Sequence, residues 1–219
     1  HTHHCVRARA HGPAPLLPPP GRYAILVAMK KEEIITLPNP HLRQKSAKVH
    51  VVTPEAEALA RDMIAAAVDW ENSRPHEISA ALAAVQIDRL ERAIVVRHDF
   101  DDKNNKDFMV LFNPEIVKYE GTLTYEHEGC LSVKNIYGRV PRYSTVRVKA
   151  MDEQGNIIRI KARGFLARVL QHEIDHCNGI VFIDHIKDQR DAFFELDEKG
   201  ELQPLDYDTH IKANRILWD

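Results

Sequence analysis

The chain has 219 residues, of which 44% are hydrophobic and 28% are charged, and its formal net charge is −2. Such a chain is typical of one globular domain, and its near-neutral charge argues against a specific nucleic acid or a membrane surface as its main partner. No apolar run approaches the roughly 20 residues of a membrane span, and three cysteines are too few for a disulfide framework, which favours the cytoplasm.

Residues 1–28 differ in composition from the rest of the chain. They begin with His, contain no Asp or Glu, and carry five of the twelve prolines. We expect them to be an expression-derived or disordered leader before a natural start at Met29, because the absence of Ser makes a transit peptide a poorer explanation. Residues 29–219 are then expected to form a single domain with a variable tail from about residue 187.

A helix is predicted near the start of this domain. Thr53 is a suitable N-cap, Pro54 occupies the first helical position, and an apolar stripe at helical spacing runs on to Trp70. The stripe indicates core packing and no cofactor site. The small-residue stretch ISAALAAVQI at 78–87 follows, and it suits close approach of another backbone.

Strands dominate the middle of the chain. RAIVVRH and FMVLFNP read as strands, and the alternation in residues 146–163 predicts an antiparallel hairpin that turns at 154–156. Residues 164–177 return to helical periodicity and end at Asn178 and Gly179. The expected fold class is α+β, with mostly antiparallel strands packed around this second helix. The tail has no clear pattern.

The second helix carries the motif HEIDH. Residues four apart on a helix are stacked neighbours, so His172 and His176 can offer two imidazoles to one metal, with Glu173 beside it as a base. A pair of hydrogen-bonded core histidines is the alternative. We favour the metal because this motif arises rarely by chance.

The third ligand decides the class of site. A metzincin-type protease would have a third His where this chain has Phe182, which excludes that class. A thermolysin-like site would take a downstream glutamate, and spacing leaves three of them open: Glu195, Glu198 and Glu201. Upstream, Cys130 stands in EGCLS, 42 residues before His172. One thiolate and two imidazoles suit Fe(II), Zn or a neighbouring divalent metal, with one position left for water.

EGCLS at 128–132 and QHEIDH at 171–176 together resemble the peptide deformylases, in order and in separation. The third motif of that family, G-x-G-x-A-A-x-Q, has a variant here in SAALAAVQ at 79–86. The resemblance covers Met29 to about Ile186. It implies a single catalytic domain that hydrolyses the N-formyl group of the initiator methionine on nascent polypeptides and releases formate.

The resemblance also assigns the metal site. It implies that Cys130, His172 and His176 bind one divalent metal, usually Fe²⁺ in this family, with Zn²⁺, Ni²⁺ or Co²⁺ as substitutes. Gln171 and Asp175 belong to the same motif, and we expect them to orient the ligating imidazoles.

By the same resemblance, Glu173 is the general base and acid. The side-chain amide of Gln86 and the backbone N–H of Leu131 are expected to stabilise the formyl oxygen as it becomes an oxyanion. Glu128 and Arg142 are expected to form an ion pair near the mouth of the pocket.

Ser79 and Ala81 replace the two glycines of the first motif. Their side chains are expected to narrow a groove in which substrate lies against the strand, either without effect or with altered substrate choice. Gly129, Phe165 and Val169 are further candidates for the substrate-binding wall.

Three functions follow from these residues. The first is a peptide deformylase in the cytoplasm, with N-formyl-methionyl nascent peptides as substrate and the ribosome near its exit tunnel as a further partner. The second is an H-E-x-x-H metallopeptidase. The third, suggested by Ser79 and Ala81, is a weakly active deformylase-like protein that binds N-terminal peptides without processing them.

Overall fold

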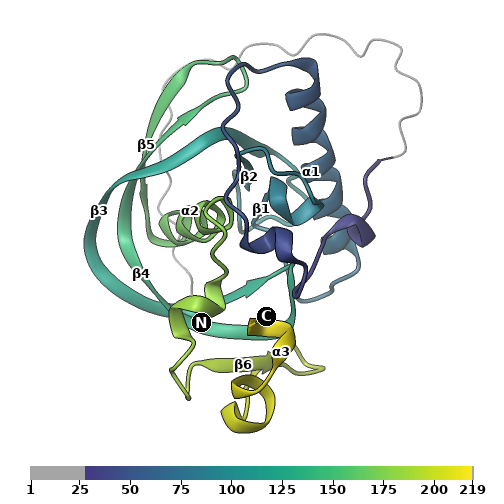
Figure 1. The fold of residues 1–219 in the computed structure, drawn as a ribbon, viewed down its shortest axis with the longest axis vertical. Coiled ribbons are helices and arrows are strands. Elements are labelled where there is room, and N and C mark those ends of the chain that lie inside the picture. The colour runs from purple at the N-terminus through teal and green to yellow at the C-terminus, as the bar shows by residue number, and fades with distance from the viewer. Residues whose placement is uncertain (1–27, 219) are drawn as a thin grey trace.

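The computed structural model describes residues 28–218, so the leader predicted for 1–28 lies outside the described residues except for Ala28. One antiparallel sheet and two main helices make up the fold, as Figure 1 shows. The strands are β1 (Ala81–Ala83), β2 (Ala93–Arg97), β3 (Phe108–Cys130), β4 (Val133–Met151), β5 (Ile157–Arg163), β6 (Phe193–Leu196) and β7 (Leu202–Pro204). The helices are α1 (Pro54–Asn72), α2 (Gly164–Cys177) and α3 (Arg215–Trp218). The α+β prediction is confirmed, and no helix in the described part is long and apolar enough to cross a membrane.

Helix α1 begins as the sequence predicts. The Thr53 hydroxyl accepts a hydrogen bond from the Ala56 backbone N–H at 3.3 Å, and Pro54 opens the first turn. The stripe that includes Leu59 and Met63 is buried, and it packs against β1 and β2. This helix covers one face of the short strands and lies apart from the predicted metal site.

Strands β1 and β2 are buried on both faces. Ala93 and Val95 face the cluster under α1, whereas Ile94 and Val96 face the cluster around α2. Because both faces are covered, β2 reads as a continuous apolar run instead of an alternation. In the described sheet, β1 pairs only with β2, so its other edge is open.

Strands β3 and β4 form a long curved hairpin that is wrapped around α2 in Figure 1. FMVLFNP predicts only the first residues of β3, because the whole strand has 23 residues and ends at Cys130. Four register shifts between β3 and β4 interrupt the pairing, and each one breaks the two-residue alternation that a sequence pattern needs. The predicted hairpin at 146–163 is confirmed as β4 and β5, with Val148 opposite Ile160.

Helix α2 begins directly after β5 and is largely buried inside the curved sheet. The Gln171 side chain holds the helix to β4, because its amide donates to the Tyr143 carbonyl at 2.9 Å and its oxygen accepts from the Tyr143 N–H at 3.0 Å. At the other end, Arg92 donates to the carbonyl of Cys177 at 3.0 Å and to the Asn178 side chain at 2.9 Å. A cation at this end stabilises the helix dipole.

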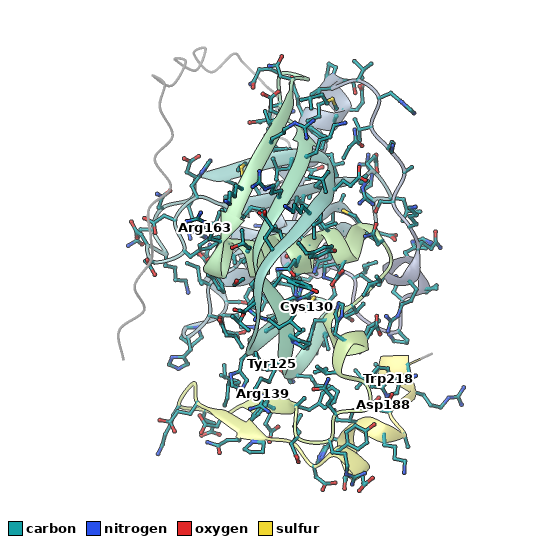
Figure 2. All side chains as sticks on the ribbon, turned by 90° about the vertical axis from the view of Figure 1, so that its left-hand side faces the viewer. Tyr125, Cys130, Arg139, Arg163, Asp188 and Trp218 are labelled. Carbon is teal, nitrogen blue, oxygen red and sulfur yellow. The ribbon has the colours of Figure 1, made fainter. Side chains whose placement is uncertain are left out.

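The tail, which the sequence leaves unplaced, extends the same sheet. β6 pairs with β4 through Gly138 and Tyr137, and β7 pairs with β6. A short helical segment at Asp208–Lys212 and α3 complete the chain, with Ile211 and Leu217 buried in the core around α2. In Figure 2 this yellow segment lies beneath the end of the long hairpin that carries Tyr125 and Arg139.

Candidate active site

Three possible metal ligands meet where β3 ends against α2. Cys130 is the last residue of β3, and His172 and His176 lie one turn apart on α2. One ligand atom from each lies within 4.8 Å of the other two, and Cys130 Sγ is 3.2 Å from His176 Nε2. The three glutamates that spacing left open, Glu195, Glu198 and Glu201, are not in this group. The donor set is therefore one sulfur and two imidazoles.

A buried carboxylate, Glu128, orients the first imidazole. Its Oε2 lies 2.9 Å from His172 Nδ1, which leaves Nε2 as the nitrogen free to bind a metal. Burial alone would raise the pKa of Glu128, but its bonds to His172 and Arg142 hold that pKa well below the ordinary range. Burial likewise opposes a charged His172, yet its contacts with Cys130 and Glu128 raise its pKa well above the usual value. Glu128 therefore stays ionised behind His172 and holds that imidazole in one orientation.

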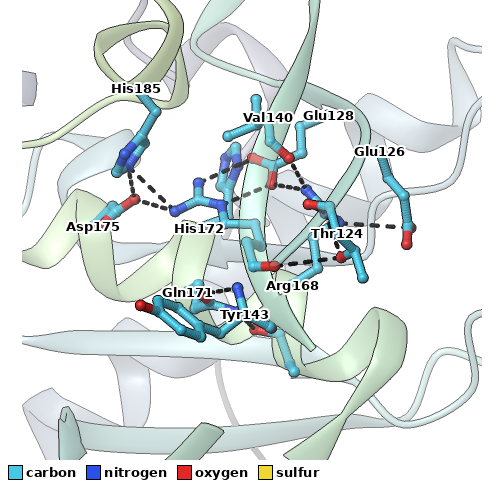
Figure 3. Close-up of polar contacts among 12 residues, drawn as sticks. Thr124, Glu126, Glu128, Val140, Tyr143, Arg168, Gln171, His172, Asp175 and His185 are labelled. Atoms are coloured by element: carbon cyan, nitrogen blue, oxygen red, sulfur yellow. Dashed lines mark hydrogen bonds and ion pairs between the residues drawn. The ribbon is translucent and has the colours of Figure 1, made fainter. Parts of the chain in front are cut away.

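Two buried arginines, Arg142 and Arg168, bond to Glu128, and Figure 3 labels Arg168 beside Glu128 and His172. Arg142 Nε lies 2.8 Å from Oε1 of Glu128, and Arg168 Nη1 donates to the same oxygen at 2.8 Å. Arg168 also donates to the carbonyls of Val140 and Thr124. The predicted Glu128–Arg142 ion pair is present, but it lies behind His172 in the interior and not at a pocket mouth.

The expectation that Gln171 and Asp175 orient the imidazoles of His172 and His176 is wrong. Gln171 bonds to the β4 backbone, and Asp175 Oδ2 accepts from Arg142 at 2.6 Å and lies 2.7 Å from His185 Nε2. Neither carries a hydrogen bond to a ligating imidazole in the described structure. The spacing of the helical motif could not reveal that Glu128, from strand β3, contacts His172 instead.

Glu173 is the unusual group of the site. It is buried, and its Oε2 atom has no hydrogen-bond partner among the described residues. Burial raises the pKa of Glu173 to about 7, whereas burial and the neighbouring His172 lower the pKa of His176 to about 3. A buried carboxyl without a hydrogen-bond partner lowers the stability of the fold, and such groups occur mostly at functional sites. A metal cation and its bound water beside the three candidate ligands would give Glu173 a partner, so these residues fit a metal.

Gln86 points its amide toward the cluster. Its Oε1 accepts from the Ala83 N–H at 2.9 Å, which fixes the orientation of the amide, and Nε2 lies 3.1 Å from Ser132 Oγ and 3.5 Å from Cys130 Sγ. Ser132, which holds this amide, was missed by the sequence analysis although it belongs to the EGCLS motif. Leu131 lies in the two-residue turn between β3 and β4, directly after Cys130.

A cavity of about 480 Å³ opens onto these groups. Its lining contains four of the five predicted substrate-binding residues: Ala81, Gly129, Phe165 and Val169. Gly129 leaves room for the Tyr137 ring, because a Cβ at that position would lie 2.5 Å from it. The apolar side chains beside the cluster are suited to a methionine side chain.

Ser79 does not line this cavity. It is fully buried, its N–H donates to Glu71 Oε2 at 2.9 Å, and its carbonyl accepts from Arg97 Nε at 3.1 Å. Glu71 and Arg97 form a buried ion pair that also includes Lys106. The Ser79 backbone thus serves the ion pair, and its hydroxyl is buried without a hydrogen-bond partner among the described residues. Of the two residues that replace the glycines, only Ala81 lines the cavity.

Comparison with known proteins points to one family. A family model for polypeptide deformylase matches residues 31–192. A peptide deformylase of Thermomicrobium roseum is 43% identical over 176 residues, which is 79% of this chain and 96% of the relative. The crystal structure of a peptide deformylase from Synechococcus elongatus in complex with actinonin aligns with a TM-score of 0.64 and 32% identity, over 78% of this chain and 89% of that one. The Met-Ala-Ser-bound peptide deformylase from Acinetobacter baumannii aligns with a TM-score of 0.64 and 28% identity, over 73% and 99% of the two chains.

Proposed function

The chain belongs to the peptide deformylase family of metal-dependent hydrolases acting on N-formyl peptides, and we propose that Cys130, His172 and His176 hold its catalytic metal. The observation that carries this assignment is the group of three ligand atoms within 4.8 Å of one another beside the unpartnered carboxyl of Glu173. We propose Fe²⁺ as the native ion, with Zn²⁺, Ni²⁺ or Co²⁺ as substitutes. A donor set of one thiolate and two imidazoles supports any of these ions.

A bound divalent ion would supply Lewis acidity toward a water molecule and toward the formyl carbonyl. Glu173 takes the proton from the attacking water, because a carboxyl with a pKa of about 7 can both accept and return a proton near neutral pH. It then gives the proton to the leaving amine. The products are formate and a free N-terminal methionine.

Two donors stabilise the negative charge on the formyl oxygen. The Gln86 amide is held by Ala83 and Ser132 with its N–H groups toward Cys130, which supports this role. The Leu131 backbone N–H, one residue after a ligand, is the second donor. Because both are positioned before substrate arrives, they cost little reorganisation in the reaction.

The substrate is proposed to lie along the open edge of β1, with its methionine side chain between Phe165 and Val169. Ala81 and Gly129 line the same cavity and contact the peptide backbone. An extended peptide at that edge would gain main-chain hydrogen bonds in the manner of an added strand.

We also propose that residues 29–219 act as one catalytic domain in the cytoplasm, on nascent chains near the exit tunnel of the ribosome. Pairing of β6 with β4 supports the single domain, because the tail shares the sheet that surrounds α2. The use of nascent formylated chains as substrate supports the location.

The test is formate release from formyl-Met-Ala-Ser by protein purified without oxygen and loaded in parallel with iron, nickel or zinc. Glu173→Ala should abolish turnover while metal remains bound, and Cys130→Ala should abolish both. Cleavage of internal peptide bonds without formate release would support an endopeptidase. Saturable peptide binding without formate release, with every metal, would support the weakly active binder and overturn the assignment.

A further inference from the structure

The C-terminal hairpin, residues 193–204, forms part of the wall of the substrate cavity. Leu196, Asp197 and Glu198 from its first strand and turn line the same cavity as Cys130 and Glu173. The family model ends at residue 192, immediately before this hairpin. The hairpin therefore lies outside the residues that the family model matches, and it reaches the substrate cavity.

The hairpin is held firmly at its base. Phe193 pairs with Gly138 and Phe194 pairs with Tyr137 of β4, so both hairpin residues belong to the main sheet. Phe193 is buried in the core around α2, and the Phe194 ring lies edge-on against His127 at 4.5 Å. Backbone pairing and a buried ring therefore anchor the base of the hairpin to the sheet.

The tip of the hairpin is equally well defined. Asp197 organises the turn, because its carboxylate accepts hydrogen bonds from the N–H groups of Lys199 and Glu201 and from the Gln203 side chain. The turn also lies against the loop after α1, since a Cβ at Gly200 would lie 2.9 Å from the His76 ring. The carboxylate of Asp197 is thus engaged, and Glu198 next to it is held in a fixed turn.

Most other charges of the lining are already paired. Arg74 and Glu77 lie 3.5 Å apart, and Glu77 also accepts a hydrogen bond from the Tyr137 hydroxyl. Glu198 is exposed, and it has no ion pair or hydrogen bond among the described residues. Lys134 on β4 is exposed in the same way and contributes one positive charge to the lining of the same cavity.

The hairpin as a whole is acidic. It carries four carboxylates and a single lysine, Lys199, so its local potential is negative although the chain is nearly neutral. A peptide that extended along this wall after its methionine would meet the free carboxylate of Glu198. Like charges would repel there, and a basic side chain would gain an ion pair.

We propose that Glu198 is a specificity-determining residue that favours substrates with Lys or Arg at a position after the formyl-methionine, over substrates with Asp or Glu. The inference rests on the proposed deformylase function and on the same cavity. Ion pairs at exposed positions are weak, so the expected preference is about two- to five-fold in kcat/KM and decreases as salt is added.

The experiment measures kcat/KM for formyl-Met peptides with one Lys or one Glu at the second, third or fourth residue. The enzyme should prefer Lys at one of these positions. Glu198→Gln should remove the preference and Glu198→Lys should reverse it. Glu195→Lys is the matched control, because it makes the same charge change on the same hairpin. Side chains alternate along β6, so Glu195 points to the side that does not line the cavity. The ratio of kcat/KM for the Lys peptide to that for the Glu peptide should therefore remain that of the natural protein.

The inference would be overturned if the ratio of kcat/KM for the Lys peptide to that for the Glu peptide were the same in the natural protein and in Glu198→Lys at every peptide position tested. An equal change in Glu195→Lys would also overturn it, because the effect would then come from net charge. Failure of the proposed function has a different signature, which is that the natural protein releases no formate from the neutral peptide formyl-Met-Ala-Ser.

Discussion

Replacement of Glu128 by Gln tests the carboxylate behind the proposed metal site. Glu128 accepts hydrogen bonds from two buried arginines and lies 2.9 Å from His172 Nδ1. Removing one partner of a buried ion pair costs about 3–5 kcal/mol. The lower end applies here, because Arg142 keeps Asp175 at 2.6 Å and Arg168 keeps two backbone carbonyls. We therefore expect a loss of about 3 kcal/mol in the free energy of unfolding.

The same substitution should weaken metal binding. A ligating imidazole that loses its carboxylate partner is less well oriented and less basic, and such changes cost roughly 10- to 100-fold in metal affinity. Unfolding in urea, measured on chelator-treated protein, gives the stability change without the metal. Competition with a coloured chelator then gives the affinity.

Glu126→Gln is the matched control on the same strand. The Glu126 side chain is 57% exposed and lies 3.6 Å from Arg168 Nε, so its loss should change stability by less than about 0.5 kcal/mol. A Glu128→Gln protein within about 1 kcal/mol of the natural one would refute the claim that the arginines depend on this carboxylate. Unchanged metal affinity in a destabilised protein would refute its role in orienting His172.

Three further predictions concern separate parts of the site. Gln86→Glu keeps the acceptor for the Ala83 N–H but removes the amide donor, so kcat should fall by about 10²- to 10³-fold in the formate assay with little change in KM. Burial raises the pKa of Glu173 from 4.5 to about 7. In chelator-treated protein, its contribution to stability is therefore fully present below pH 4.5 and is lost as pH rises through 7. Urea unfolding at pH 5 and at pH 8 should show a loss of up to about 3 kcal/mol in the free energy of unfolding, and the Glu173→Gln protein should lack this loss. Gly179→Ala should lower the free energy of unfolding by about 2 kcal/mol or more, because φ is +75° and the new Cβ would lie 2.4 Å from the Arg43 carbonyl oxygen. Gly155→Ala is the control, since φ is +82° but no atom lies within 4 Å of the new Cβ. It should cost about half as much in the same assay.

The three candidate ligands, which the structure brings together, can be predicted from the sequence because metal binding needs particular residue types at particular spacings. His172 and His176 are neighbours on any helix, and Cys130 was found through a motif. Glu128 was predicted as a partner of Arg142, but its contact with His172 depends on how β3 bends around α2. Local patterns carry no information on that bend, because the register shifts in β3 break the alternation.

Ser79 was expected to line the groove, and the structure shows that it does not. Its place in the first motif suggested a side chain in the groove, but the backbone at this point serves the buried pair of Glu71 and Arg97. These partners lie only 8 and 18 residues from Ser79, on α1 and β2, but the contacts depend on how the helix packs against the strands, which a short pattern does not reveal. The tail was unreadable for a related reason, since its short strands are stabilised by β4 and not by their own periodicity.

The junction between β5 and α2 has a consequence for insertions and deletions. β5 ends at Arg163, α2 begins at Gly164 with φ of +57°, and Gln171 is bonded to Tyr143 on the neighbouring strand. No residue separates the sheet from the helix, so one added residue would rotate α2 by about 100° and turn both histidines away from Cys130. The β4–β5 turn is exposed at residues 153–156 and carries no such constraint. Changes in length should therefore be accepted in that turn and rejected between Arg163 and His176.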